Sequence, residues 1–171
     1  ERLASVQARK LTTIRKSHAA TLETARAKMI TSGDIYAPNG TVVGNVYTDF
    51  GVTRKQVAMD LTNAATDILG KQREIVDHIQ DNIMSGETPS EIIALCSPSY
   101  FDAYISQAGV KEAYKFYTST QEPLRNGNWS QFRHGDITLI RYNGKFKDAS
   151  GVSQALIPDG DAYYLPLDTS D

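Results

Sequence analysis

A long helix is the clearest element that the pattern of apolar and polar positions predicts. Within residues 1–31, apolar or small side chains recur at spacings of three and four, which place them on one face of an α-helix. These positions are Leu3, Leu11, Ile14, Leu22, Ala25 and Met29, with Gln7 and His18 interrupting the same stripe. At 1.5 Å per residue such a helix would reach roughly 46 Å, whereas a compact domain of this length measures about 40 Å across. We therefore expect one end or face of the helix to meet another molecule.

The rest of the chain predicts shorter elements of both kinds. The long helix is expected to end at 31–33, where Gly33 supplies a left-handed cap. A β-hairpin is expected over 34–50 with its turn at Asn39-Gly40, followed by an ambiguous stretch at 54–66 in which 56–59 could form a short strand. Three helices are expected: one over 68–83, capped by Thr66 or Asp67 and ending at Ser85-Gly86, one from Ser97-Pro98 through Tyr104, and one over 110–117 after a break at Gly109. Strands are expected over 91–96 (buried), over 132–142 after a loop at 124–131, and over 162–167 after a turn at 158–160. Helices and strands are interleaved, so the fold class is α+β.

Charge is unevenly distributed along the chain. Residues 1–31 carry seven Lys or Arg against two Glu, a balance of +5, while the remaining 140 residues hold 11 basic and 18 acidic side chains, a balance of −7. One interpretation is an ordinary solvated helix surface. The other is a basic helix that faces an acidic neighbour, either another subunit or a polyanion. Since the helix has no aromatic side chains for base stacking, sequence-specific reading of nucleic acid is not expected.

Residues that could carry chemistry are few. Cys96 is the only cysteine, and its apolar setting favours a small buried side chain over a reactive thiol. Asp77, His78 and Asp81 share one helical segment, yet a surface histidine is the stronger interpretation than a metal ligand. His18 and His134 are isolated, and Asp159 and Asp161 flank Gly160, where turn formation explains them.

No sequence motif for phosphate binding, nucleophilic catalysis or zinc hydrolysis is present. We therefore expect no catalytic, cofactor-binding or metal-binding residues. No apolar run approaches the roughly 18 residues that a membrane span needs, and the first residues do not resemble a signal peptide.

The order of the segments resembles the central part of a tailed-phage major capsid protein of the lambda type, the protein E family. The resemblance covers nearly all 171 residues, although each motif is short. It is carried by the basic opening Glu1-Arg2-Leu3-Ala4-Ser5-Val6-Gln7, by Leu22-Glu23-Thr24-Ala25-Arg26, by Asp67-Ile68-Leu69-Gly70, by Ala94-Leu95-Cys96-Ser97-Pro98-Ser99-Tyr100-Phe101, by Phe132-Arg133-His134-Gly135-Asp136-Ile137 and by Leu156-Ile157-Pro158-Asp159-Gly160-Asp161-Ala162.

The resemblance implies the tailed-phage major capsid fold. Residues 1–58 would form part of a peripheral domain, with a spine helix and a β-hairpin, and residues 59–171 part of a mixed α/β axial domain. The chain lacks an initiator Met and ends directly after a strand, so we expect it to be a fragment of a longer polypeptide.

The implied function is that of a structural, non-enzymatic subunit of a phage or prophage capsid. Its partners would be copies of itself in pentamers and hexamers, a scaffold or decoration protein, and packaged double-stranded DNA through non-specific contacts, with no membrane. It would be located in the virion capsid after assembly in the cytoplasm of the bacterial host. Two alternatives remain open from the sequence: an α/β domain that binds a small molecule, which would need an apolar cleft, and a hydrolase with an unrecognised site.

Overall fold

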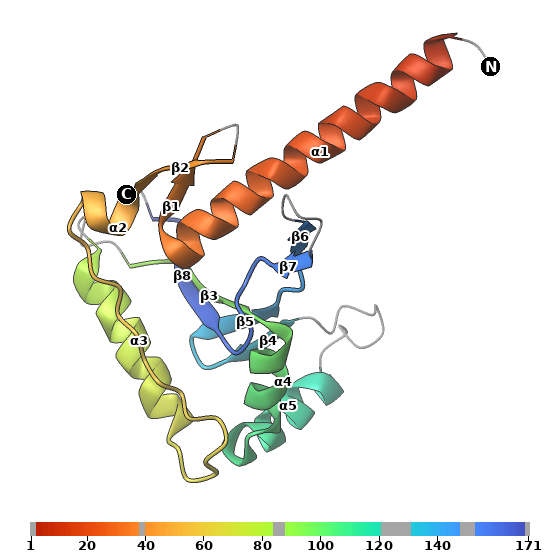
Figure 1. The fold of residues 1–171 in the computed structure, drawn as a ribbon. Coiled ribbons are helices and arrows are strands. Elements are labelled where there is room, and N and C mark those ends of the chain that lie inside the picture. The colour runs from red at the N-terminus through yellow and green to blue at the C-terminus, as the bar shows by residue number, and fades with distance from the viewer. Residues whose placement is uncertain (1–2, 38–39, 84–87, 121–130, 148–152, 170–171) are drawn as a thin grey trace. The chain divides into compact units, whose positions relative to one another are not determined.

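The structure, a computed structural model, divides the chain into two compact units. The first unit comprises residues 1–54 and 144–156, and the second comprises 55–143 and 157–171. The residues that the structure describes are 3–37, 40–83, 88–120, 131–147 and 153–169 (Figure 1). Each unit is considered by itself below.

The first unit is built on the helix α1 (Leu3–Ser32), which confirms the predicted long helix. It ends where the sequence predicts, because Gly33 has a φ of 79° and its N–H donates to the carbonyls of Lys28 and Met29 at 3.1 and 3.0 Å. Only Ala27 and Thr31 of this helix are buried. Several threonine hydroxyls along the exposed part donate to the backbone carbonyl four residues earlier, as Thr12 does to Ala8 at 2.9 Å.

Two hairpins complete the first unit. Strands β1 (Asp34–Tyr36) and β2 (Val42–Asn45) pair antiparallel, as predicted, although Asn39 of the predicted turn lies outside the described residues. The prediction that the second strand reaches Phe50 is wrong. Asn45 ends β2 because its side chain accepts hydrogen bonds from the N–H groups of Tyr47 and Thr48, which caps the short helix α2 (Val46–Asp49). The antiparallel pair β6 (Lys145–Lys147) and β7 (Ser153–Ala155) was not predicted.

The second unit contains a four-stranded sheet in the order β4-β5-β3-β8. The predicted strands at 91–96 and 162–167 are confirmed as β3 (Glu91–Cys96) and β8 (Ala162–Leu167), which are antiparallel to each other. The prediction of one strand over 132–142 is wrong. Gly135, with a φ of 62°, turns the chain between β4 (Gln131–His134) and β5 (Ile137–Arg141), which pair antiparallel. Strand β5 then pairs parallel to β3.

Three helices belong to the second unit. Helix α3 (Ile68–Asn82) is capped by Asp67, and α4 (Pro98–Ser106) is capped by Ser97 with Pro98 in its first turn, as predicted. The break before α5 (Ala108–Thr120) falls at Gln107 rather than at Gly109, because the side-chain oxygen of Gln107 accepts from the N–H of Gly109 at 2.7 Å and starts the helix.

The remaining expectations concern irregular segments. The strand suggested at 56–59 does not form, since these residues carry no regular element. Helix α3 ends at Asn82, because Ile83 has an extended backbone, whereas the predicted end at Ser85-Gly86 lies outside the described residues. Most of the predicted loop at 124–131 also lies outside them.

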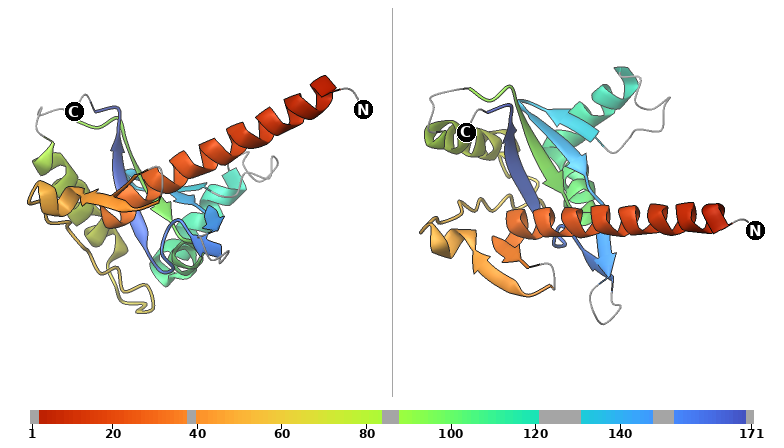
Figure 2. Two further views of the ribbon diagram at one scale, coloured as in Figure 1. Left: turned by 45° about the horizontal axis from the view of Figure 1, so that its top comes forward. Right: turned by 90° about the horizontal axis from the view of Figure 1, so that it is seen from above.

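The main core joins one face of this sheet to the three helices. Alternate residues of β3, namely Ile92, Ala94 and Cys96, are buried, as expected for a strand with one face in the core. They pack with Met59 of the irregular segment and with residues of β4, β5 and all three helices: Ile68, Ile75, Tyr100, Phe101, Tyr104, Val110, Phe132, Ile137 and Leu139. Figure 2 shows the strands of this sheet side by side in two further views.

Candidate functional site

The most exposed element of the first unit is the N-terminal two thirds of α1. Every side chain from residue 3 to residue 23 is exposed except that of Val6. The exposed side chains include large apolar ones, with Leu3 75% and Ile14 63% accessible, and Leu11, Leu22 and Met29 are also exposed. Because burial of such side chains is favourable by about 1.5–3 kcal/mol each, a row of them on one helix indicates a surface that another molecule covers.

The C-terminal end of α1 is fixed to the first hairpin. The Tyr47 hydroxyl donates to the carbonyl of Ile30 at 3.0 Å, and the Asn45 side-chain amide donates to the carbonyl of Ser32 at 2.9 Å. These contacts satisfy carbonyl groups that have no partner within the helix. The Tyr47 ring lies so close to Gly33 that a Cβ there would be 2.4 Å from it.

Charged groups reinforce the same junction. The Arg54 guanidinium donates to the carbonyl of Thr31 and lies 5.3 Å from the centre of the Tyr47 ring, which places a cation at the negative end of the helix dipole. Hydrogen bonds from Ser32 and Asn45 lower the pKa of Asp34 below its ordinary value. The exposed part of α1 is therefore held by a fixed polar junction at its other end.

The second unit has a buried polar centre around Tyr104. The fully buried Tyr104 hydroxyl accepts from the Gln72 side-chain amide at 2.7 Å and lies 2.8 Å from Nδ1 of His134. Burial raises the pKa of Tyr104 and lowers that of His134. Both groups are therefore neutral near pH 7, and the hydroxyl can donate to the ring nitrogen. The contacts link α3, α4 and β4, so His134 takes part in holding these elements together.

Burial also raises the pKa values of the tyrosine and cysteine side chains near this centre. The hydroxyls of Tyr100 and Tyr164 lie 2.8 Å apart, and burial raises the pKa of both. Cys96 is fully buried, as predicted, and burial raises its pKa to about 12, which suppresses the reactive thiolate. These side chains belong to a core in which the buried hydroxyl and thiol groups have hydrogen-bond partners.

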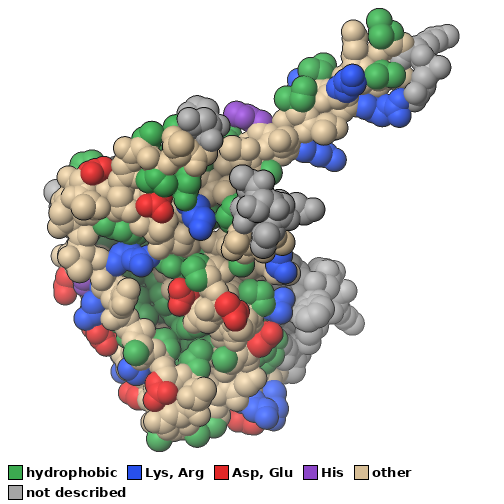
Figure 3. Space-filling view, viewed as in Figure 1, with side chains coloured by type: hydrophobic (Ala, Val, Ile, Leu, Met, Phe, Trp, Pro, Cys, Tyr) green, Lys and Arg blue, Asp and Glu red, His purple; other side chains and the backbone are tan. Residues whose placement is uncertain are grey.

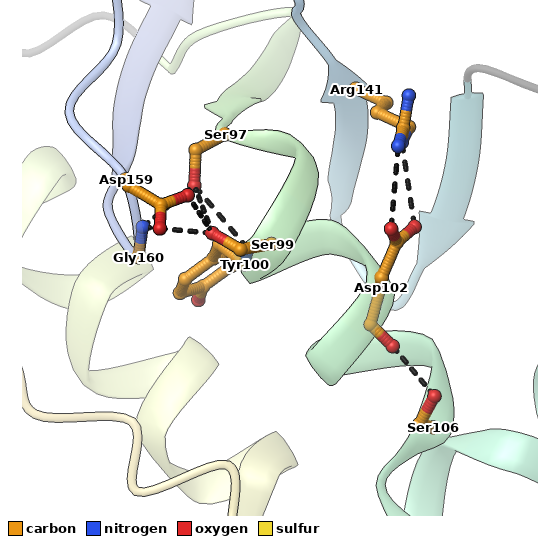
Figure 4. A network of polar contacts seen from close by, with 8 residues as sticks. All are labelled: Ser97, Ser99, Tyr100, Asp102, Ser106, Arg141, Asp159 and Gly160. Carbon is orange, nitrogen blue, oxygen red and sulfur yellow. Dashed lines mark hydrogen bonds and ion pairs between the residues drawn. The ribbon is translucent and has the colours of Figure 1, made fainter.

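A polar network fixes the turn before β8 to the start of α4 (Figure 4). The Asp159 carboxylate accepts from Ser99, and the N–H of Gly160 donates to the hydroxyls of Ser97 and Ser99 at 3.0 Å each. Gly160 has a φ of 83°, so the turn predicted around it is confirmed.

An ion pair lies further along α4 in the same view. Both guanidinium contacts from Arg141 to the Asp102 carboxylate measure 3.3–3.4 Å, and the Ser106 hydroxyl donates to the Asp102 carbonyl (Figure 4). The pair is partly exposed, and such pairs contribute little to stability. It joins β5 to α4.

The side chains considered as metal ligands do not come together. His18 and His78 are exposed on α1 and α3, and the Asn82 amide lies 3.2 Å from the His78 ring. Among the described residues, no three His, Cys, Asp or Glu side chains are grouped so that they could hold a metal. None of the described helices combines the length and apolar character that crossing a bilayer requires.

A hollow of about 300 Å³ is present in the second unit, beside the start of α5. It is open to solvent and is lined by Leu61, Thr62, Ala64, Ala103, Ser106, Gln107 and Ala108. The alternative function, binding of a small molecule, needs an apolar cleft that surrounds the ligand. This hollow is open to solvent, and none of its lining residues has a titratable side chain.

Comparisons with known proteins identify the family of the chain. The family model of the phage major capsid protein E matches residues 1–171. The major capsid protein of Pseudomonas phage KPP10 is 36% identical over 179 residues, covering 97% of this chain and 51% of that protein. The major capsid protein of Salmonella phage Felix O1 is 27% identical over 172 residues, covering 90% of this chain and 46% of that protein. The chain therefore spans about half the length of these relatives.

These matches place the chain in the class of phage structural proteins, with mixed α and β structure. The chain belongs to the phage major capsid protein E family. The family resemblance inferred from the order of short segments is thereby confirmed.

Proposed function

We propose that the chain is part of a structural subunit of a phage or prophage icosahedral capsid, which self-assembles into a shell around double-stranded DNA. Family membership supports the class, and the exposure of α1 is the structural observation that carries the proposal. Helical stability in proteins comes mainly from packing of an apolar face. A subunit whose neighbours cover α1 accounts for its length and its exposed leucines.

The proposal assigns a mechanical role and no catalytic step. Copies would form pentamers and hexamers through head-to-tail contacts, which close into rings when the rotation between subunits allows. A scaffold or decoration protein would be a further partner, and packaged DNA would be contacted without sequence preference. The protein would act in the virion capsid after assembly in the cytoplasm of the bacterial host.

The domain assignment is part of the same proposal. Residues 1–58 would belong to the peripheral domain and most of residues 59–171 to the axial domain. The boundary between the two units after Arg54 supports a first domain that contains the helix and its hairpin. The grouping of residues 144–156 with the first unit suggests that the second hairpin accompanies it.

Electron microscopy of the full-length protein tests the proposed function. The protein that contains this chain is expressed with its complete sequence, with and without any scaffold protein, and is separated on sucrose gradients at several salt concentrations. We expect shells, tubes or capsomer rings by negative staining. A uniform monomer or dimer under all these conditions would contradict the proposal.

A further inference from the structure

The exposed large apolar side chains of α1, together with the partly buried Ala25, form a straight stripe. They repeat every eleven residues, and eleven residues make about three helical turns, so the stripe runs nearly parallel to the helix axis. The two buried side chains of this helix, Ala27 and Thr31, lie on the opposite side. The first unit therefore leaves the stripe uncovered. The stripe consists of Leu3, Leu11, Ile14, Leu22, Ala25 and Met29.

Basic residues line both edges of this stripe. At 100° per residue, Lys10 and Lys28 fall along one edge, and Arg15 and Arg26 fall along the other. The surface is thus apolar along its centre and positive along both sides. A partner that matches it needs an apolar surface with acidic side chains nearby.

Further exposed apolar side chains of the same unit lie on the first hairpin and directly after α2. These side chains, here called the hairpin patch, are Ile35 (41% accessible), Val42 (53%), Val43 (65%), Phe50 (76%) and Val52 (54%). Figure 3 shows hydrophobic side chains both on the projecting part of α1, together with Lys and Arg, and over the end of the unit that holds the hairpin.

The segment that carries the hairpin patch has a charge balance opposite to that of α1. Residues 30–53 contain two acidic side chains, Asp34 and Asp49, and no Lys or Arg, and Arg54 follows directly. The Asp34 carboxylate accepts hydrogen bonds from Ser32 and Asn45, which lower its pKa. The hairpin patch therefore has the apolar character and the acidic neighbours that the stripe requires.

We propose that the stripe of one copy docks on the hairpin patch of a second copy, with Lys10, Arg15 and their neighbours facing Asp34 and Asp49. The contact is head-to-tail, because it joins two different surfaces of the same unit, and so it continues from copy to copy. This inference rests on the proposed function. Duplex DNA is a poorer occupant, since phosphates would engage the cations but leave the apolar centre of the stripe in water.

Cross-linking between two variants of the full-length protein, each with one added cysteine, tests this contact. Ile14→Cys lies on the stripe, Val43→Cys lies on the hairpin patch, and the native Cys96 is buried. The matched control is Lys16→Cys, an exposed position on the opposite side of α1. The two variants carry tags of different mass, are mixed under assembly conditions and are oxidised, so that a heterodimer reports only a contact between copies.

The inference predicts about ten times more I14C–V43C heterodimer than K16C–V43C heterodimer, a difference that corresponds to about 1.4 kcal/mol. Equal yields in preparations that form particles would overturn the inference while the proposed function stands. Protection of the Ile14→Cys thiol from maleimide only when duplex DNA is added would assign the stripe to nucleic acid and also overturn it. Absence of particles from the wild-type full-length protein would instead overturn the proposed function.

A second set of variants does not depend on cross-linking. Ile14→Asp and Val43→Asp each place a carboxylate in the proposed contact and should lower particle yield about tenfold, while Lys16→Asp should lower it less. Circular dichroism of the unassembled subunits shows whether each variant folds. Equal particle yields for folded I14D and K16D proteins would contradict the inference.

Discussion

Tyr104→Phe removes the hydroxyl at the centre of the second unit and leaves the ring in place. Tyr104 is fully buried, and its hydroxyl is 2.7 Å from the Gln72 amide and 2.8 Å from His134 Nδ1. Gln72 is 4% exposed, so its amide has no easy access to water after the change. His134 is only partly buried, and a water molecule can replace the hydroxyl there.

The magnitude follows from these differences in burial. A buried donor left without an acceptor costs about 1–3 kcal/mol, and the half-exposed histidine adds little. We therefore expect Tyr104→Phe to lower the free energy of unfolding of the second unit by about 2 kcal/mol, a factor of about 30 in its opening equilibrium.

Hydrogen exchange of the buried amides in β3 and β5 is a suitable assay, because it reports on this unit even if the two units unfold separately. Tyr100→Phe is the matched control. Its hydroxyl contacts the partly buried hydroxyl of Tyr164 at 2.8 Å, and we expect a loss of about 1 kcal/mol or less. Equal protection in the wild-type protein and in Tyr104→Phe would refute the argument that loss of the hydroxyl leaves the buried Gln72 amide without an acceptor.

Three further changes test other parts of the structure. Gly33→Ala should destabilise the junction of α1 by more than about 2 kcal/mol, because it combines a φ of 79° with a Cβ 2.4 Å from the Tyr47 ring. The control is Gly51→Ala, which has a φ of 63° but open space around the new Cβ and should cost about 1 kcal/mol. Amide exchange in the first hairpin measures both, and equal effects would contradict the close approach. The burial that lowers the pKa of His134 makes the unfolded state bind a proton more readily, so the free energy of unfolding should fall as the pH drops below about 6.5. Urea titrations at several pH values should show this slope and its loss in His134→Asn, and an unchanged slope in the variant would exclude the ring as its source. The Cys96 thiol, with its pKa raised to about 12, should react with a disulfide reagent at pH 8 only after denaturation; rapid reaction of the native protein would contradict its burial.

Sequence patterns predicted the elements that carry their own local signals. The long helix ends at the glycine that caps it, α3 and α4 start at Asp67 and Ser97, and β3 has the expected length. These features depend on neighbouring residues, through caps and alternation, and so they can be read without tertiary contacts.

The errors in the predicted elements occurred where a single residue overrides the local pattern of apolar and polar positions. Asn45 ends β2 by capping α2, although the residues after it favour a strand. Gln107 starts α5 by binding the N–H of Gly109, so the glycine itself does not break the helix. A single glycine, Gly135, splits the predicted long strand into two. Such choices depend on geometry that composition and spacing do not record.

The candidate surface was only partly predictable. The stripe on α1 and the excess of positive charge are visible in the sequence, and they indicated a partner. The sequence did not show that Ala27 and Thr31 lie on the far side of the helix, which leaves the stripe outside the core of its own unit. The hairpin patch was also missed, because exposure of Val43 and Phe50 follows from tertiary packing and not from their apolar character.

Cryo-electron microscopy of particles formed by the full-length protein tests the central claim most directly. The account predicts a closed shell of this subunit, in which a neighbouring copy covers the side of α1 that carries Leu11 and Ile14. Particles in which that side faces solvent or the interior, with no protein over it, would contradict the account.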